Sequence, residues 1–277
     1  PAQLSVTQIE TLIRDPYALY ARKVLGLHEW EPVDGPILAT HRGTFLHAIF
    51  ENLLRNNGGI FPEDIPDAVM QTAEKLAGEM PGGAMILDFW RARLLALADW
   101  FGTYERDREY QATQVWVEAK GEICWDIAGA PFKLTAKADR IDKRADGTYR
   151  IIDYKTGQLP TQQAINNHTA VQMTLEAAMV ERGAFAGEGV RAGEVSNLEY
   201  MQLSGRYPPG SARAVNFELG LFDATLGSVD SLIRAYRDAG KPYISQARPN
   251  LINFESRYDH LARVDEWRAN MLGGEDT

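Results

Sequence analysis

The fold of this chain is decided by the run Lys137-Ala138-Asp139-Arg140-Ile141-Asp142 and by the run Ile151-Ile152-Asp153-Tyr154-Lys155-Thr156-Gly157 that follows it. Residues 134–142 and 148–156 have the composition of two strands. Ala145-Asp146-Gly147 between them favours the backbone angles of a tight turn. The sequence therefore predicts a β-hairpin that carries several charged side chains.

A turn centred on Asp146 places Asp139 and Asp153 directly opposite each other, with Cβ atoms about 5 Å apart. Lys155 shares the face of Asp153 in any register, whereas a shift of the turn by one residue would separate the two acids. Two facing carboxylates repel, and burying either one unpaired is costly. A hard cation such as Mg²⁺ or Mn²⁺ is their natural partner, and Lys155 could orient or help deprotonate a water beside it.

The alternative is a solvated hairpin with ordinary surface ion pairs among Asp139, Arg140, Asp142, Lys143 and Lys155. Such pairs contribute less than about 1 kcal/mol each and need no metal. The spacing of these residues alone does not decide between the two interpretations.

The spacing D-x13-D-Y-K-T-G over residues 139–157 resembles the core motif of the PD-(D/E)XK nuclease superfamily, in its RecB-like branch. Other segments resemble motifs of that branch in the same order: Pro16–Tyr20 with Val24–Leu27, Arg42–His47, Gln172–Glu176, and Tyr258–Arg263 with Glu266-Trp267. Each segment alone is a weak signal, but the ordered set spans nearly the whole chain. The set is similar to the C-terminal nuclease domain of AddB-type repair proteins.

This resemblance implies a mixed α/β (α+β) fold with a central mixed β-sheet flanked by helices, as in restriction endonucleases. It also implies a metal-dependent deoxyribonuclease, most readily an exonuclease, that acts in double-strand break repair and recombination. The partners implied are DNA and an AddA-type helicase–nuclease subunit. A stand-alone Cas4-like or phage-type exonuclease, and a non-catalytic docking module with the same fold, are the alternatives.

The resemblance also assigns roles to individual residues. It implies that Mg²⁺, or Mn²⁺ in its place, is held by His47, Asp139, Asp153 and the backbone carbonyl of Tyr154. Lys155 is the catalytic lysine by the same resemblance, and Gln172 supports the site.

Two features depart from the family pattern. Many RecB-like members have Tyr where this chain has Glu176, which puts a phosphate contact at that position in doubt. Several relatives carry four cysteines for an iron–sulfur cluster, but the lone Cys124 cannot hold one. We expect Cys124 to be a small buried residue, and residues 249–267 to be held by packing and polar contacts instead.

Three other side chains near these motifs need separate arguments. A lone helical histidine is more often structural than a ligand, but His47 lies at the edge of an apolar stripe formed by Leu46, Ile49, Phe50, Leu53 and Leu54. Its place in the motif order favours a ligand. Glu51, one turn further on, is expected to face solvent or to support the site. Glu118 could join the site, although an edge or surface strand position is the favoured interpretation.

Length and composition predict one large domain. The chain has 277 residues, of which 45% are hydrophobic. We expect one nuclease domain over 1–277, with a mainly helical part at 1–110, the catalytic sheet and glutamine helix at 111–220, and a helical extension at 221–277. Pro1 in place of an initiating Met favours a fragment of a longer chain.

Local signals give the expected order of elements. Ser5 and Gln8 form a capping box, Asp15-Pro16 should interrupt the first helix, and a long amphipathic helix runs through Trp90–Tyr104 with Glu105 on its charged face. The remaining expected elements are strands at 113–119 and 122–127, a helix at 162–181, strands at 197–203 and 214–219, and a helix at 226–236.

The net charge of −9 is the main objection to a nucleic-acid enzyme, because DNA affinity depends on neutralising phosphates. A DNA-handling partner could supply the positive charge, and clusters such as Lys137, Arg140, Lys143 and Arg144 could line a groove. There is no P-loop motif for an ATP-driven motor. No apolar run is long enough for a membrane span, no signal peptide is recognised, and a single Cys fits a reducing compartment, so we expect a cytoplasmic protein.

Overall fold

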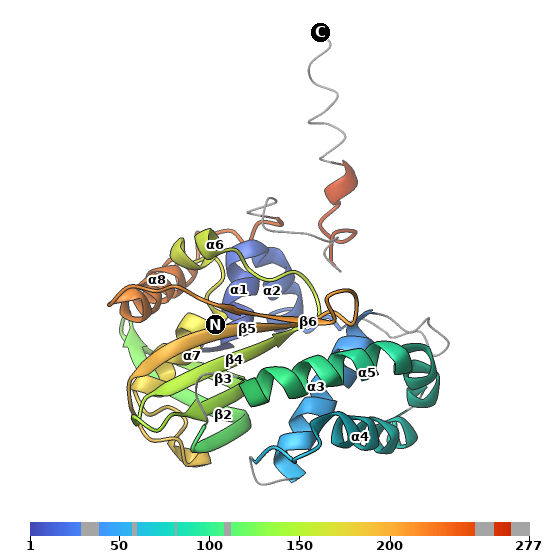
Figure 1. Cartoon of the computed structure of the whole chain (residues 1–277). Helices are drawn as coiled ribbons and strands as arrows, with labels where there is room; N and C mark the ends of the chain where they lie inside the picture. Colours follow the sequence, from blue (N-terminus) through green and yellow to red (C-terminus); the bar gives the residue numbers. More distant parts are fainter. Residues whose placement is uncertain (29–38, 57–59, 81, 108–111, 247–257, 267–277) are drawn as a thin grey trace.

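The structure is a computed structural model that describes residues 1–28, 39–56, 60–80, 82–107, 112–246 and 258–266 (Figure 1). Its elements are, in chain order, β1 (Gln3–Ser5), α1 (Val6–Arg14), α2 (Pro16–Lys23), α3 (Ala39–Asn56), α4 (Ile65–Glu79), α5 (Gly83–Asp107), β2 (Gln114–Ile127), β3 (Ala130–Lys143), β4 (Tyr149–Lys155), α6 (Gln162–Asn166), α7 (Gln172–Glu181), the 3₁₀ helix η1 (Ala186–Glu188), β5 (Val195–Leu203), β6 (Gly210–Ala214) and α8 (Leu221–Tyr236). Within these residues, no helix is both long and apolar enough to cross a bilayer.

Strand β3 organises a mixed sheet because each of its edges pairs with other strands. One edge pairs antiparallel with β2 along nearly its whole length. The other edge pairs first with the parallel strand β1, over Lys133–Thr135, and then with the antiparallel strand β4, over Arg140–Lys143. Strand β4 continues the sheet to β5 in parallel, and β6 closes it antiparallel to β5. The expected mixed sheet with flanking helices is confirmed.

The predicted hairpin is confirmed together with its register. Gly147 has a φ of +88°, which favours glycine, and its N–H donates to the carbonyl of Arg144 at 3.0 Å. The strand partners run from Lys143 with Tyr149 to Arg140 with Ile152. One further step in this register sets Asp139 opposite Asp153, at the point where the regular pairing of β3 with β4 ends.

Helices cover the two faces of the sheet and form two cores (Figure 1). One core contains the apolar residues of α1, α7 and α8 with Ile151 and Leu198. The other contains those of α3, α4 and α5 with Ile152 and Met201. Neighbouring residues of β4 thus enter opposite cores, as the alternation of side chains along a strand requires. The strand is buried on both sides, and it carries Asp153 and Lys155 between the layers.

Helix α1 confirms the capping box expected from the sequence. The side chain of Ser5 accepts the N–H of Gln8 at 3.2 Å, and Gln8 Oε1 accepts the N–H of Ser5 at 3.0 Å. Asp15 ends α1 and caps α2 by accepting the N–H of Ala18 at 3.2 Å, with Pro16 as the first residue of α2. These local interactions fix the direction of α1 relative to the sheet.

Three expected elements have different bounds. Strand β2 is continuous instead of broken near 120, because Lys120 and Gly121 keep their partners Lys137 and Ala136 on β3. The helix expected over 162–181 is two helices, α6 and α7, separated by a segment in which His168 has a φ of +52°. The strand expected at 214–219 lies at 210–214, where it pairs with β5. Of the expected C-terminal segment 249–267, only 258–266 lie within the described residues.

Cys124 is exposed, contrary to the expectation that it is buried. It lies on β2 between Ile123 and Trp125, which pack against the α1 and α7 core. Alternation along the strand turns the intervening thiol to the outside. The size and apolar character of cysteine do not decide its burial here.

A buried ion cluster connects α5 to the sheet. The fully buried guanidinium of Arg140 donates to Glu105 at 2.7 and 3.2 Å and to Asp142 at 2.6 and 2.8 Å. It also lies over the ring of Phe61, 4.9 Å from the centroid. Arg140 is therefore neither a surface residue nor part of a DNA groove, and Glu105 is not on an exposed helix face. Both sequence interpretations are wrong because packing of α5 on the sheet buries them together.

Replacing Glu105 by Ala should destabilise the chain by about 3 kcal/mol in urea unfolding, because a buried guanidinium loses one of its two carboxylate partners. Glu74 provides the control. Its pair with Arg91 at 3.0 Å is exposed, and Glu74→Ala should cost less than about 1 kcal/mol. Equal effects of the two variants would contradict this role for the Arg140 cluster.

Candidate active site

The candidate site lies where β3 and β4 part. Pairing of β3 with β1 ends at Thr135, and pairing with β4 begins at Arg140. Beyond this point, the N–H of Tyr154 donates to Oδ2 of Asp139 at 2.9 Å. A side-chain carboxylate thus accepts a backbone hydrogen bond where β4 leaves β3. The gap between the strands opens beside Asp139 and Asp153.

The same position is a kink in the β2–β3 pair. Buried residues of β3 that enter the α1 and α7 core follow the strand period up to Ala138, but the next is Ile141, three residues later. On β2, Glu118 has a φ of +54°, and the residues on either side of it pair with Arg140 and Ala138. The period of both strands therefore changes at Glu118 and Asp139, and a positive φ at a glutamate is an uncommon conformation.

Three side chains from different elements converge at this kink. His47 from α3, Glu118 from β2 and Asp139 from β3 each offer a ligand atom, and these atoms lie within 4.8 Å of one another. Nδ1 of His47 is 3.6 Å from Oδ2 of Asp139. One imidazole and two carboxylates are suitable ligands for a divalent cation such as Mn²⁺ or Mg²⁺.

Packing of α3 explains the position of His47. The apolar stripe predicted from the sequence is buried, including Leu46, Ile49 and Phe50. His47 projects beside this stripe and meets the ring of Tyr154 edge to face, with the centroids 6.1 Å apart. The structure thus brings together His47 and Asp139, as the sequence predicts.

Glu118 is the residue whose importance the sequence does not reveal. Its local sequence favours an edge or surface position, but its side chain is 8% exposed and belongs to the three-residue cluster. A signal for this position exists in the pairing of β2 with β3, which sets Glu118 opposite Asp139. The local sequence Val115–Glu118 does not contain that pairing.

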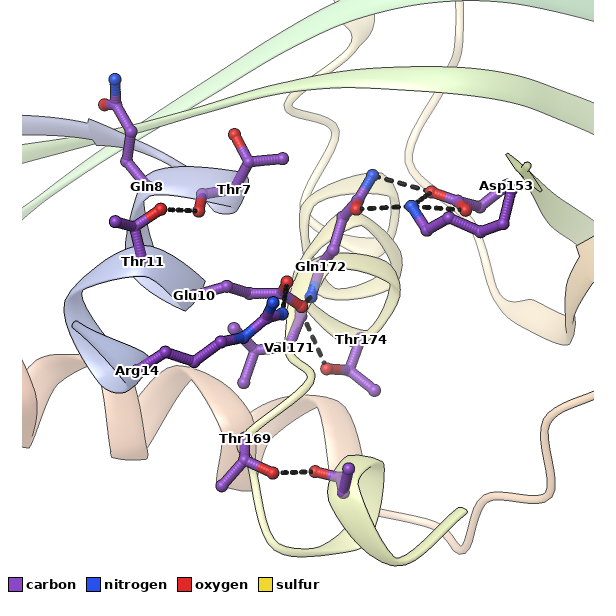
Figure 2. Close-up of polar contacts among 12 residues, drawn as sticks. Thr7, Gln8, Glu10, Thr11, Arg14, Asp153, Thr169, Val171, Gln172 and Thr174 are labelled. Atoms are coloured by element: carbon purple, nitrogen blue, oxygen red, sulfur yellow. Dashed lines mark hydrogen bonds and ion pairs between the residues drawn. The ribbon is translucent and has the colours of Figure 1, made fainter. Parts of the chain in front are cut away.

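Asp153, Lys155 and Gln172 form a second group of contacts beside the cluster (Figure 2). The ammonium of Lys155 donates to Oδ1 of Asp153 at 2.8 Å and lies 2.7 Å from its Oδ2. Lys155 also donates to Oε1 of Gln172 at 3.1 Å, and Nε2 of Gln172 donates to Oδ1 of Asp153 at 2.8 Å. Each predicted catalytic side chain of this group is held by the other two.

Glu176 lies one helical turn beyond Gln172 and accepts from its Nε2 at 3.2 Å. With only 1% of its surface exposed, Glu176 supports Gln172 from within the protein. Burial raises the pKa of Glu176 well above its usual value, and the charges of Asp153 and Asp139 raise it further. A neutral carboxyl group is therefore favoured at the position where many relatives have Tyr.

Burial also controls the titration of the other site residues. It raises the pKa of Asp139, against the charge of Lys155, and raises the pKa of Asp153 to about 6. It lowers the pKa of His47, which favours a neutral imidazole. Burial alone would lower the pKa of Lys155, but the charge of Asp153 outweighs it and the pKa is raised. Lys155 is therefore a stable cation at neutral pH.

The donor set fits a divalent cation. A neutral imidazole can donate its lone pair, and Oε2 of Glu118 and both acids of the hairpin point to a need for positive charge. The ammonium of Lys137 forms an ion pair with Oε2 of Glu118. The fourth predicted ligand, the backbone carbonyl of Tyr154, belongs to the part of β4 that pairs with β5, where Tyr154 partners Met201. Its role as a ligand stays a prediction.

Metal binding should depend on Glu118 and compete with Lys137. Glu118→Gln should weaken Mn²⁺ binding about tenfold or more in a calorimetric titration, because one anionic ligand is lost. Lys137→Gln should strengthen Mn²⁺ binding a few-fold, because the competing ammonium is removed. The exposed pair of Glu122 and Lys133, 2.9 Å apart on the same two strands, is the matched control. If Glu118→Gln and Glu122→Gln had the same affinity as the unchanged protein, Glu118 would not be a ligand.

The stability of the metal-free protein should fall with rising pH through the titration of Asp153. Its folded-state pKa of about 6 exceeds the ordinary value of 3.8, so the folded chain holds the proton more tightly than the unfolded chain. This stabilisation is complete below 3.8 and lost as the pH rises through 6. Asp153→Asn removes the titration. Relative to that variant, the metal-free protein should lose on the order of 2 kcal/mol between pH 4 and 7.

Denaturant unfolding in EDTA at several pH values measures this difference. Asp139 and Asp153 are coupled, so the midpoint belongs to the pair. Parallel curves for Asp153→Asn and the unchanged protein would show that Asp153 has no raised pKa in the folded state.

Relatives of this chain carry the same region within longer proteins. An uncharacterized protein of Rickettsia typhi is 31% identical over 214 residues, which cover 74% of this chain and 24% of that protein. A subunit of the ATP-dependent helicase/deoxyribonuclease of Streptococcus agalactiae is 28% identical over 162 residues, which cover 56% of this chain and 14% of that protein. The chain thus spans about a quarter or less of the length of these two relatives.

A crystal structure, that of SSO0001, is also similar, with a TM-score of 0.37 and 12% sequence identity over 84% of this chain and 76% of that chain. This likeness is too distant to carry an argument. A model of the PD-(D/E)XK nuclease superfamily matches residues 3–251, a range that contains His47, Glu118, Asp139 and the run from Asp153 to Gln172. On this match, the chain belongs to the PD-(D/E)XK nuclease superfamily.

Proposed function

We propose that this chain is a metal-dependent deoxyribonuclease that hydrolyses DNA phosphodiesters at the gap between β3 and β4. The observation that carries the proposal is the juxtaposition of two groups. The cluster of His47, Glu118 and Asp139 has the ligands for a divalent cation. The ion pair of Asp153 and Lys155 lies beside it, and the lysine is held by Gln172. A simple docking module would not require these groups to be assembled.

A bound Mg²⁺ or Mn²⁺ would polarise the phosphoryl oxygen, lower the pKa of a bound water and stabilise the leaving oxyanion. His47, Glu118 and Asp139 would hold it, and Asp153 is the further ligand that the family motif implies. Asp153 then has two functions, since it also orients Lys155.

Lys155 stabilises charge in this proposal and does not act as a base. Its raised pKa keeps the ammonium protonated at neutral pH, and three hydrogen-bonding or ionic contacts to Asp153 and Gln172 restrict its position. A fixed cation can orient the attacking water and offset the negative charge that develops on the phosphoryl oxygens. This role is narrower than the expectation from the sequence, which leaves deprotonation of the water open.

The biological setting is a further part of the proposal. Similarity to a protein of a helicase/deoxyribonuclease complex supports a role in double-strand break repair, beside an AddA-type subunit in the cytoplasm. The net charge of −9 favours a partner that brings DNA to the site. We propose exonuclease activity with Mg²⁺ in this setting. A stand-alone Cas4-like or phage-type exonuclease is the second candidate, and it would cut free DNA ends without a partner.

Cleavage of end-labelled single- and double-stranded DNA tests the proposed chemistry. With Mg²⁺ or Mn²⁺ the protein should cut, and EDTA should stop it. Lys155→Ala should reduce cleavage at least about 100-fold while Mn²⁺ binding is retained, because only an electrostatic contact is lost. Asp153→Ala should lose both. Lys133→Ala is the control, since Lys133 lies on β3 but forms its ion pair with Glu122.

Normal cleavage by Lys155→Ala would remove the lysine from the mechanism. Undiminished Mn²⁺ binding by Asp153→Ala would exclude Asp153 as a ligand. If the chain is inactive both alone and within its longer parent with a helicase partner, the docking-module alternative is supported.

A further inference from the structure

The first turn of α7 has an unusual cap. Its N-cap residue, Val171, offers no side-chain hydrogen bond, although the first N–H groups of a helix have no partner within the helix. The N–H of Gln172 instead donates to Oε1 of Glu10 at 3.1 Å, across 162 residues of sequence. Figure 2 shows Glu10 reaching from α1 to the start of α7. A negative charge at this helix end is also favoured by the helix dipole.

Glu10 is itself held in place. Its other carboxylate oxygen forms an ion pair with Arg14, one turn further along α1, and its side chain is only 14% exposed. Ile9 and Leu12 anchor α1 in the core, and the capping box fixes the start of that helix. A short rigid helix thus presents the carboxylate to α7.

The residue that receives this contact also orients the site. Gln172 is the first residue of α7, and both ends of its side-chain amide are used: Oε1 accepts from Lys155, and Nε2 donates to Asp153. The position of its backbone sets where the amide group lies. The atom that Glu10 binds is therefore the backbone nitrogen of the residue that holds both Asp153 and Lys155.

We propose that Glu10 is a positioning residue for cleavage, which acts through the backbone of Gln172 to set the place of the Lys155 ammonium. This inference rests on the proposed nuclease function and deepens it. Glu10 does not touch the metal cluster or the substrate. A merely structural role would tie α1 to α7 without affecting the orientation of Gln172, and the two roles differ in their measurable consequences.

A double-mutant cycle separates them. Glu10→Ala should lower kcat about tenfold, because small displacements of a catalytic group are costly, while KM and Mn²⁺ affinity stay within about twofold. Glu10→Gln should restore most of kcat, since its amide oxygen can accept the same N–H. In a Gln172→Ala background, Glu10→Ala should cause no further loss, because residues that act through one contact are not additive.

Glu181→Ala is the matched control. Glu181 is the last residue of α7, and its Oε1 accepts the N–H of Val195 at 3.3 Å, so it also joins α7 to another element through one backbone hydrogen bond. It lies at the opposite end of the helix from Gln172. The variant should leave kcat unchanged.

Amide hydrogen exchange tests the anchoring step without any need for activity. Glu10→Ala should raise the exchange rate of the Gln172 N–H at least tenfold and leave that of Val195 unchanged. Unchanged exchange at Gln172 would overturn the proposal, and so would additive losses of kcat in the double-mutant cycle or an equal loss in Glu181→Ala. Loss of all cleavage in the unchanged protein would instead reject the proposed function, while the exchange result would still decide whether Glu10 holds the start of α7.

Discussion

The change of partner along one edge of β3 is the constraint on which the site depends. Strand β1 pairs with this edge up to Thr135 and β4 pairs with it from Arg140 onward, so the two strands leave a gap between them. At the gap, Asp139 accepts the N–H of Tyr154 with its carboxylate. The kink at Glu118 on the neighbouring strand occurs at the same level. The acids converge here because regular strand pairing stops here.

Charge is buried on both sides of this gap, and each side compensates it differently. On the α5 side, Arg140 is neutralised by Glu105 and Asp142, which makes a closed and fully paired cluster. On the α7 side, Lys155 pairs with Asp153, but several further acids remain close to it. Burial raises the pKa of Asp139, Asp153 and Glu176 there. The first arrangement holds the sheet and α5 together, whereas the second leaves an excess of carboxylates that suits a cation.

The parts of the site that depend on local sequence could be predicted. The turn residues Asp146 and Gly147 fix the hairpin register, and this register brings Asp139 level with Asp153. The place of His47 follows from the apolar stripe of α3. Glu118 could not be found in this way, because its position depends on the pairing of β2 with β3 and on a positive φ. Burial of Arg140 with Glu105 similarly depends on how α5 packs against the sheet, which no local pattern contains.

A structure of the protein with Mn²⁺, located by its anomalous scattering, tests the central claim most directly. The account predicts a peak among His47, Glu118 and Asp139, within bonding distance of all three side chains, with Lys137 withdrawn from Glu118. A peak that touched Asp153 as well would be consistent with the family motif. A Mn²⁺ ion bound elsewhere, or none at a concentration that supports cleavage, would contradict the proposal that the gap between β3 and β4 is the metal site.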